Sequence, residues 1–563
     1  MDAYQDKINE RLTALNLPTN LRLDQYQNLL DFYQQMIDKY SDRPVYSCLG
    51  HTISFQELDE HANAFAAFLQ DHQHLQPGDR IALQLPNILQ FPVAFLGAMR
   101  AGLIIVNTNP LYTATELEHQ LNDSGAKALL VLANVADTAA KIVAKTSVKT
   151  IIVTELADLH PQPKRFLLNA AVKYIKKMVP NFHFKESVKF SSIMSEYSGK
   201  LPDRISKNLD DVAILQYTGG TTGVAKGAML THGNVLANAM QCAPIFDSFG
   251  LKEQDRECIV QPLPLYHIYA CTVGLVILSK GAHTVLVPNP RDLPSLVKAM
   301  GQQRFTGFCG LNTLFIALCK NEQFKQLDFS ALKMTLSGGM ALTQFAAEQW
   351  QQVTGKVIYE GYGLTETSPV VSVNPGGAER LGTIGVPVPE TQIAIRDDDG
   401  YDLPIGERGE LCVKGPQVMK GYWQREEATA ESIIDGWFAT GDIAILDDEG
   451  YLSIVDRKKD MILVSGFNVY PNEVEDTICN HADVLEAAAI AEKDEQSGEV
   501  VHVYAVLENR DNHVSESDLR DFCRQTLTGY KIPKRIFFVD ELPKTNVGKV
   551  LRRKVKEHVT ILN

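Results

Sequence analysis

The chain has 563 residues, which is too long for a single hydrophobic core and predicts at least two domains. Its residues are 45% hydrophobic and 22% charged, as is typical of globular proteins, and its net charge is −14. This charge argues against nucleic acid as a general partner, because no excess of cations exists to displace counterions from phosphates.

The N-terminus and the cysteines favour a cytoplasmic protein. The segment from Met1 to Lys7 has no apolar signal core, and no stretch reaches the ~18 apolar residues of a membrane-spanning helix. The nine cysteines include no Cys-x-x-Cys pair, which indicates reduced thiols rather than a disulfide framework or a zinc site.

The first hundred residues contain clear helix signals. Apolar residues within 24–40 recur at helical spacing and predict a helix with one buried face. Two capping boxes, Ser54-x-x-Glu57 and Thr113-x-x-Glu116, predict the starts of two further helices.

Short apolar runs then alternate with helical patterns, which predicts parallel sheets covered by helices. The predicted strands are 80–85, 103–106, 127–132, 150–153, 212–215, 258–263, 283–287, 305–308, 334–336 and 357–359. In such sheets, ligands bind beyond the carboxyl ends of the strands.

Residues 164–178 combine basic and apolar side chains at helical spacing. Two interpretations stay open for this segment. One is a basic amphipathic helix that rests on the inner face of a membrane. The other is an amphipathic helix packed on its own domain with a solvated basic side.

The C-terminal third changes character. From about residue 382, short strands and turns such as Asp399-Gly400 and Glu449-Gly450 predict antiparallel hairpins. The charged run 456–460 separates this region from a tail with strands at 486–491, 500–507 and 535–538 and helices at 472–479 and 516–526. We therefore expect an α/β protein with two parallel sheets and a small β-barrel subdomain (about 382–456) in an N-terminal domain, 1–456. A small mobile α+β domain, 457–563, would follow.

A glycine-rich loop, Tyr217-Thr-Gly-Gly-Thr-Thr-Gly-Val-Ala-Lys-Gly227, lies at the end of a predicted strand and before a helix-like segment that begins near Asn234. Its backbone amides, hydroxyls and Lys226 are suited to an anion. It is not a Walker P-loop, because Lys226 lies three residues past Gly223 and precedes Gly227.

This loop resembles the signature of the adenylate-forming acyl-CoA synthetases, a superfamily that includes luciferases and the adenylation domains of peptide synthetases. Further matches follow in order from about residue 50 to 555. Within the superfamily, residues 107–112, 118–125, 216–226 and 455–472 resemble the bacterial long-chain fatty acid–CoA ligases. The sequence from Phe308 to Thr313 departs modestly from the one usual in that subgroup. This departure could alter the shape of the pocket.

The resemblance implies the reaction ATP + fatty acid + CoA → acyl-CoA + AMP + diphosphate, through an acyl-adenylate and with Mg²⁺. The product would feed fatty acid degradation and lipid metabolism, and a homodimer is a further expectation. Three rival interpretations stay open. One is an adenylate-forming enzyme for another acid or for a carrier-protein thiol, and another is an acyl-binding or scaffold protein without catalysis. The third and weakest is a non-enzymatic membrane adaptor built on the basic segment 164–178.

The resemblance also implies a nucleotide site. The phosphate residues would be Thr218, Gly219, Gly220, Thr221, Thr222, Gly223 and Lys226. Residues beside the base would be Ser337, Gly338, Gly339, Gly361, Tyr362, Gly363 and Thr365. The ribose would meet Asp442 and Arg457, and Glu366 with Thr218 would bind the metal, because magnesium prefers few carboxylates plus phosphate oxygens.

Four catalytic residues are expected: Lys549, Glu366, His267 and Thr218. Lys549 would bridge the carboxylate and the phosphate, whose charges repel by about 4 kcal/mol at ~4 Å and an effective dielectric of ~20. His267 would orient the carboxylate, and a buried core histidine is the alternative. The apolar residues after His267 suit an acyl tunnel or an ordinary core helix. Cys271 lies where some family members place a gating tryptophan.

The small domain would rotate between the two half-reactions about Lys459. That rotation would withdraw Lys549 and bring the turn at Gly466 toward the acyl-adenylate, where glycine leaves room for pantetheine.

Overall fold

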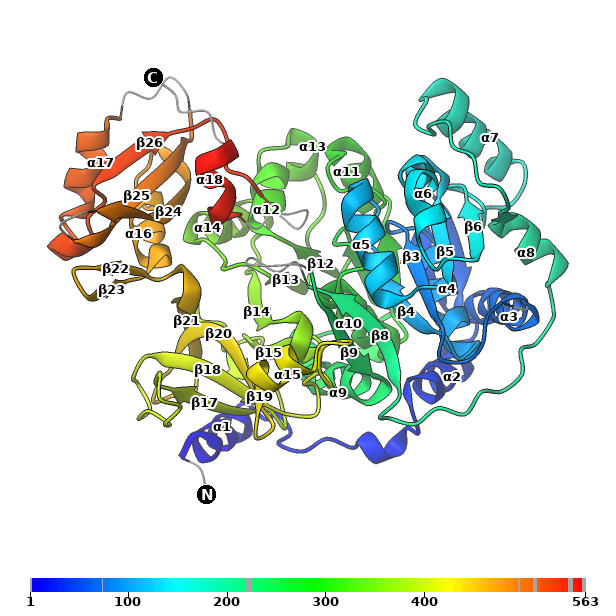
Figure 1. Ribbon diagram of the computed structural model, residues 1–563, viewed down its shortest axis with the longest axis horizontal. Helices are drawn as coiled ribbons and strands as arrows, with labels where there is room; N and C mark the ends of the chain where they lie inside the picture. The colour runs from blue at the N-terminus through cyan, green and yellow to red at the C-terminus, as the bar shows by residue number, and fades with distance from the viewer. Residues whose placement is uncertain are drawn as a thin grey trace.

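The computed structural model describes residues 3–72, 74–218, 225–494, 497–509, 514–544 and 550–558. A large N-terminal part holds two helix-flanked sheets, a smaller sheet follows, and the C-terminal residues form a separate α+β unit (Figure 1). The predicted fold class, mixed α/β with parallel sheets and a smaller C-terminal domain, is confirmed.

The first sheet has seven strands, which in spatial order are β7 (Val188–Lys189), β6 (Thr150–Thr154), β5 (Ala128–Leu132), β3 (Arg80–Gln84), β4 (Ile104–Asn107), β8 (Val212–Tyr217) and β9 (Gly227–Thr231). All neighbours run parallel except β8 and β9, which form an antiparallel hairpin. The sequence predicts five of these strands to within two residues. It does not predict the short edge strand β7, nor β9, which stands between the glycine loop and the next helix.

The second sheet has nine strands in the order β16 (Val386–Pro387), β15 (Val370–Val373), β14 (Tyr359–Gly363), β13 (Met334–Gly338), β12 (Gly307–Gly310), β10 (Cys258–Gln261), β11 (His283–Leu286), β1 (Pro44–Cys48) and β2 (His51–Ser54). Its centre is parallel and its edges are antiparallel. The hairpin β1–β2 is not predicted.

Two strands of this sheet lie further along the chain than predicted. Both β12 and β14 contain glycines, which are disfavoured in strand interiors and so hide these segments from a propensity argument. At Gly363 the reason for glycine is steric, since a Cβ atom there would lie 2.0 Å from the carbonyl oxygen of Pro369. The close approach of β15 therefore requires this residue.

The third sheet is antiparallel and consists of β17 (Gln392–Arg396), β18 (Gly409–Lys414), β20 (Trp437–Leu446) and β19 (Ile433–Ile434), with β21 (Leu452–Arg457) on β20. The predicted turns at 399–400 and 449–450 are present. The C-terminal unit contains β23 (Phe467–Val469), β22 (Ile462–Val464), β25 (Gly498–Leu507) and β24 (Val484–Asp494), with β26 (Arg535–Phe538) parallel to β25. The polypeptide crosses between these sheets at 458–461, at the end of the charged run.

The helices of the N-terminal part are α1 (Ala3–Ala14), α2 (Leu29–Tyr40), α3 (Phe55–Asp71), α4 (Gln90–Arg100), α5 (Ala114–Ser124), α6 (Ala136–Ile142), α7 (Lys164–Ala170), α8 (Phe190–Glu196), α9 (His232–Ser248), α10 (Ile268–Ser279), α11 (Leu293–Gly301), α12 (Asn312–Cys319), α13 (Glu322–Lys325) and α14 (Gln344–Thr354). Later helices are α15 (Glu426–Ser432), α16 (Pro471–Cys479), α17 (Glu516–Cys523) and α18 (Arg552–His558).

Helix starts follow the capping signals. Both predicted capping boxes are formed, at Ser54–Glu57 and Thr113–Glu116. The helix predicted over 24–40 begins only at residue 29, because the side chain of Asn28 accepts a hydrogen bond from the Asp31 amide and caps the helix there.

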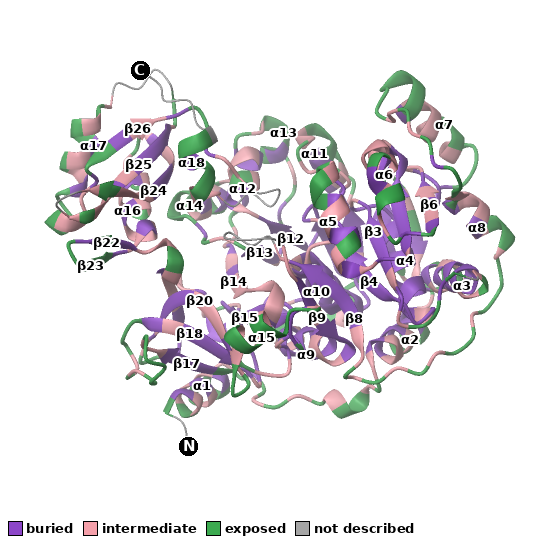
Figure 2. Ribbon diagram, viewed as in Figure 1, coloured by how far each residue is buried: buried purple, intermediate pink, exposed green. Residues whose placement is uncertain are grey.

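Two helices, α10 and α7, represent opposite ends of the range of burial in this structure. Ten of the twelve residues of α10 are buried, so this helix is embedded in the core. By contrast, α7 and the π-helical turn η4 (Ala171–Ile175) that continues it lie at the outer edge of the molecule, and all their residues except Val172 are exposed or half-buried (Figure 2). Among the described residues, no helix combines the length and apolar composition needed to cross a bilayer.

Candidate active site

One cavity of about 1110 Å³ lies beyond the carboxyl ends of β8, β13 and β14. Its lining changes from charged to apolar along its length. The polar pole contains Thr218, Lys226, Thr365, Glu366, Arg457 and Lys459. The apolar arm contains Cys242, Phe246, Val273, Val276, Val370 and Val373.

The described part of the glycine loop is held closed at its base. The amide of Thr218 donates to the carbonyl of Lys226 at 2.9 Å, and both residues line the cavity. The ring of Tyr217 packs on Gly227, where a Cβ atom would lie 3.1 Å from it. The predicted phosphate residues Gly219, Gly220, Thr221, Thr222 and Gly223 lie outside the described residues.

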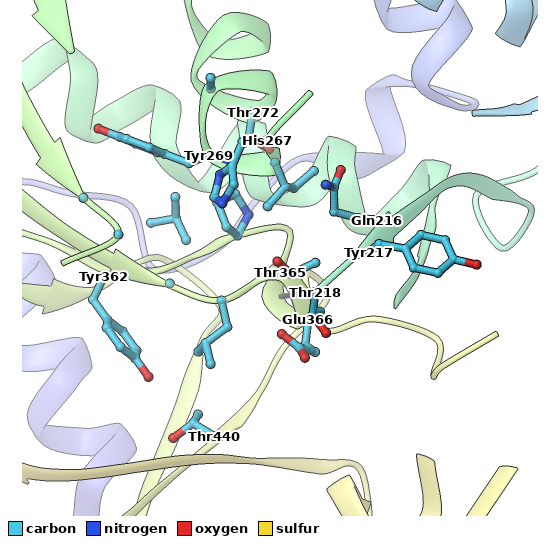
Figure 3. A pocket seen from close by; sticks show the side chains of 18 of the residues that line it. Gln216, Tyr217, Thr218, His267, Tyr269, Thr272, Tyr362, Thr365, Glu366 and Thr440 are labelled. Atoms are coloured by element: carbon cyan, nitrogen blue, oxygen red, sulfur yellow. The ribbon is translucent and has the colours of Figure 1, made fainter. Parts of the chain in front are cut away.

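Glu366 lies on a short turn after β14, close to Thr218 and Thr365 at one end of the cavity (Figure 3). Burial raises the pKa of its carboxyl group, and a hydrogen bond from Tyr422 at 2.7 Å opposes that shift. Its main-chain carbonyl accepts a hydrogen bond from the Met419 amide at 2.7 Å. Glu366 is therefore held through its side chain by Tyr422 and through its main chain by Met419.

The oxygens at this end of the cavity suit magnesium. A carboxylate from Glu366 and a hydroxyl from Thr218 are hard ligands of the kind Mg²⁺ prefers, together with phosphate oxygens and water. Among the described residues, no group of three or more His, Cys, Asp or Glu side chains is arranged to hold a metal. These two residues would thus hold the ion jointly with the nucleotide.

Tyr362, Asp442 and Arg457 form one connected group. The Tyr362 hydroxyl donates to Asp442 Oδ2 at 2.5 Å, and Arg457 Nε lies 3.2 Å from Asp442 Oδ1. Tyr362, with Gly361 and Gly363, lines the cavity, and so does Arg457. Asp442 does not line it and is only 3% exposed. In this structure the predicted ribose carboxylate is thus engaged by two protein groups.

Of the three consecutive residues Ser337, Gly338 and Gly339, which were predicted beside the base, only the two glycines line the cavity. Ser337 and Gly338 are the last residues of β13 rather than part of a turn, and Gly339 follows with a positive φ of 86°. Gly338 and Gly339 line the cavity. Ser337 does not, and its buried hydroxyl has no hydrogen-bond partner among the residues that the structure describes.

His267 caps the N-terminus of α10 and lines the cavity near its middle (Figure 3). Burial lowers the pKa of its imidazole to about 4, so the ring is neutral at pH 7. Its Nδ1 accepts a hydrogen bond from the Tyr269 amide at 3.3 Å. A neutral imidazole that accepts at Nδ1 carries its proton at Nε2, which makes His267 a hydrogen-bond donor.

The C-terminal unit also reaches the cavity. Lys544, Leu551, Arg553 and Lys554 line it, as does Lys459 of the connecting turn. The predicted catalytic Lys549 lies outside the described residues. Gly466 is in the turn between β22 and β23 and does not line the cavity; its φ of 82° is itself a reason for glycine at this position.

Several cavity residues were not predicted to have a role, and three of them stand out by their contacts. Tyr422 and Arg425 come from the segment before α15, and Tyr269 lies on α10. Arg425 Nη2 donates to Asp123 Oδ1 at 2.5 Å, and the buried Tyr269 hydroxyl finds no partner within the described part of the chain. The only sequence signal was Gly421-Tyr-Trp, a glycine followed by two aromatic residues.

Comparisons with known proteins agree with this geometry. The AMP-binding enzyme family matches residues 33–423, and the AMP-binding enzyme C-terminal domain matches residues 473–549. The ATP-bound crystal structure of MatB from Rhodopseudomonas palustris has a TM-score of 0.79 and 28% identity, covering 94% of this chain and 98% of its own. An anthranilate CoA ligase, AuaEII in complex with anthranoyl-AMP, shares the fold with a TM-score of 0.83 at 24% identity, covering 96% and 98%.

Fold, cavity and family match together place the chain among the AMP-binding enzymes, to which it belongs. A long-chain-fatty-acid–CoA ligase of Escherichia coli O6:H1 is 50% identical to it over 546 residues, 96% of each chain. Within the AMP-binding enzymes this chain therefore groups with the long-chain-fatty-acid–CoA ligases, which are AMP-forming acid–thiol ligases.

Proposed function

We propose that the cavity activates a long-chain fatty acid with ATP and then passes the acyl group to CoA. In the first half-reaction a carboxylate oxygen attacks the α-phosphorus, and the bond to diphosphate breaks. In the second, the sulfur of CoA attacks the acyl carbon, the thiol gives up its proton, and AMP leaves. The resulting acyl-CoA would enter fatty acid degradation.

The observation that carries this proposal is the apolar arm that adjoins a polar pole. On α10, the residues lining the cavity continue from His267 to Val276, and at ~1.5 Å per residue this distance is about 13 Å. Cys242 and Phe246, one turn apart on α9, line the same arm. A long unbranched alkyl chain fits such a lining, whereas an acid with a charged or polar tail would lose hydration there.

The carboxylate of the acid would lie where the two regions meet. His267 donates from Nε2 without adding positive charge, so it orients the carboxylate and leaves the oxygen nucleophilic. Lys226 and Arg457 supply cations on the nucleotide side. We assign Lys549 to the bridging role, and support comes from Lys544 and Leu551, which flank it in sequence and line the cavity.

Magnesium is proposed as the metal at Glu366 and Thr218. When bound, it would reduce the negative charge of the phosphates. The protein's contribution is to hold a carboxylate and a hydroxyl at the polar pole.

A rotation of residues 457–563 relative to 1–456 is proposed between the half-reactions, with Lys459 at the pivot. Support comes from the short turn at 458–460, the link between the third sheet and the C-terminal unit. Lys459→Pro would fix φ at the pivot. We expect diphosphate release to persist and thioester formation to fall at least tenfold; equal retention of both activities would remove the pivot assignment.

The central test supplies purified protein with palmitate, ATP, Mg²⁺ and CoA and measures diphosphate, AMP and palmitoyl-CoA. Acids of different length and type, and a carrier-protein thiol in place of CoA, test the rival adenylate-forming function. Lys549→Ala should abolish diphosphate exchange while ATP binding persists. A wild-type protein that never releases diphosphate with any acid would leave only the scaffold interpretation.

A membrane contact is proposed for the exposed apolar residues of α7–η4 and of the turn that follows it, namely Phe166, Leu167, Tyr174, Ile175 and Met178. All five side chains are exposed, up to 80% for Ile175, and lysines and an arginine surround them. Apolar side chains with a basic rim match the chemistry of an anionic bilayer surface.

Flotation with anionic and with zwitterionic vesicles tests this contact. Neutralising three exposed lysines, Lys173, Lys176 and Lys177, should release the protein from anionic vesicles. The matched control neutralises three exposed lysines of another surface, Lys141, Lys145 and Lys149. If both triple variants float like the wild type, α7–η4 does not dock on lipid.

A cytoplasmic location and a homodimer are further proposals. All nine cysteines are free thiols, and burial raises the pKa of eight of them to about 11 or 12, which agrees with a reducing compartment. The homodimer stays a prediction, and light scattering on the purified protein would test it.

A further inference from the structure

We propose that Tyr422 is a positioning residue that prepares the polar pole for nucleotide and metal. Its hydroxyl orients the carboxylate of Glu366, and its ring supports the ammonium group of Lys226. One side chain would thus hold a cation and an anion of the site in separate places before the substrates bind. This inference rests on the proposed role of Glu366 as a metal ligand.

Tyr422 is itself firmly held. Its neighbours pair with β9: Met229 N donates to Gly421 O at 2.8 Å, and Trp423 N donates to Gly227 O at 2.8 Å. The Tyr422 amide donates to Thr429 Oγ1 at 2.9 Å. The side chain is only 8% exposed. The position of the ring is therefore fixed by the same strand that follows the glycine loop.

The hydroxyl of Tyr422 orients the carboxylate of Glu366. Tyr422 OH lies 2.7 Å from Glu366 Oε1, and because a carboxylate only accepts hydrogen bonds, the phenol is the donor. Engaging one carboxylate oxygen restricts rotation of the group. Since Met419 also binds the Glu366 carbonyl, the segment 419–422 holds both the main chain and the side chain of this residue.

The ring contact concerns the loop lysine. Lys226 Nζ lies 5.0 Å from the centroid of the Tyr422 ring, within the range of a cation–π interaction. Lys226 and Glu366 line the same pole, and an ammonium on a flexible stem could otherwise pair with the carboxylate. Such a pair would have to break before phosphate and metal could bind. The aromatic ring offers Lys226 an alternative partner, and this weaker contact is easily broken when a phosphate binds.

The test uses Mn²⁺ as a spectroscopic substitute for Mg²⁺ and α,β-methylene ATP, which cannot be cleaved to diphosphate. Electron paramagnetic resonance measures free Mn²⁺ during titration of the protein–nucleotide complex. Tyr422→Phe removes the hydroxyl alone and should weaken Mn²⁺ binding roughly 10- to 100-fold, the usual effect of losing a hydrogen-bond partner of a metal ligand. Tyr422→Leu removes the ring as well.

The two variants separate the two contacts. In the presence of EDTA, Tyr422→Phe should bind the nucleotide as the wild type does, whereas Tyr422→Leu should bind it about two- to fivefold more weakly. The matched control is Tyr451→Phe, which also loses a 2.6 Å hydrogen bond of a buried tyrosine but does not line the cavity. Circular dichroism melts of all variants check folding.

Unchanged Mn²⁺ affinity in folded Tyr422→Phe, or a loss of equal size in Tyr451→Phe, would overturn the inference. Either result leaves the proposed function intact as long as the wild type forms acyl-CoA. Conversely, a wild type that forms no acyl-adenylate but shows the predicted Mn²⁺ effect would remove the proposed reaction and keep Tyr422 as the organiser of a nucleotide–metal site.

Discussion

Replacing Arg552 by glutamine should strongly destabilise the C-terminal unit. The guanidinium of Arg552 contacts Glu475 at 2.7 Å and 2.8 Å, Asp460 at 3.1 Å and Asp456 at 3.5 Å. Asp456 lies on β21, which pairs with β20 of the third sheet, so this cluster also ties the unit to the N-terminal part.

The expected magnitude follows from burial. The Asp456 side chain is 0% exposed, and those of Glu475 and Arg552 are 16% and 20% exposed. Burial already raises the pKa of Asp456 to about 6, with Arg552 opposing that shift. Removing one partner of a buried ion pair typically costs about 3–5 kcal/mol, because the remaining charge stays buried without compensation. For a unit of about 100 residues, 3 kcal/mol lowers Tm by at least about 12 °C.

Differential scanning calorimetry measures this effect as a lower-temperature transition of the C-terminal unit. The matched control is Arg524→Gln in the same unit, where the arginine pairs with Asp521 at the surface and both side chains are more than half exposed. Exposed pairs contribute about 1 kcal/mol or less. If Arg552→Gln lowers Tm no more than Arg524→Gln, the cluster does not stabilise the unit and the reasoning is refuted.

Three further predictions concern pH, backbone packing and chain length. Burial lowers the pKa of His232 to about 4, so the unfolded chain binds the extra proton between pH 6.5 and 4 and stability falls as pH decreases through that window. His232→Asn should reduce the stability loss between pH 7.5 and 5.5 by about 1 kcal/mol in urea titrations, and an unchanged loss would contradict a neutral buried ring. Gly363→Ala should weaken binding of α,β-methylene ATP, measured by calorimetry, at least tenfold, because its Cβ would clash with the backbone of Pro369 and Val370 close to Glu366. Normal affinity would show that this backbone can shift without disturbing the site. Val276→Phe should lower the kcat/KM ratio of palmitate to decanoate at least tenfold, and an unaltered ratio would place the end of the acyl chain elsewhere.

Much of the fold could be predicted from the sequence because its signals are local. Strands such as β5 and β10 are short apolar runs in an alternating pattern, and capping boxes such as Ser54–Glu57 mark helix starts directly. The strand β14 shows the limit. Its last glycine, Gly363, is explained only by the close approach of Pro369 and the start of β15, which belongs to tertiary structure.

The candidate site was predictable to the extent that it lies in recognisable motifs. Thr218, Glu366, His267 and Arg457 all line one cavity, although up to 239 positions separate them in the chain (457 − 218). Their partners were not predictable. Tyr422 lies 56 residues from Glu366 in sequence, and nothing in its local pattern indicates which carboxylate its hydroxyl reaches.

The two ends of the cavity are built from different parts of the fold. The apolar arm is formed largely by helices α9 and α10 and by β15, whereas the polar pole comes from strand ends and turns around β8, β14 and β21. Residues facing the alkyl chain can therefore vary without moving those that hold the nucleotide. Such a division lets descendants of one ancestral scaffold change the acid they accept while the energy-providing chemistry is inherited intact.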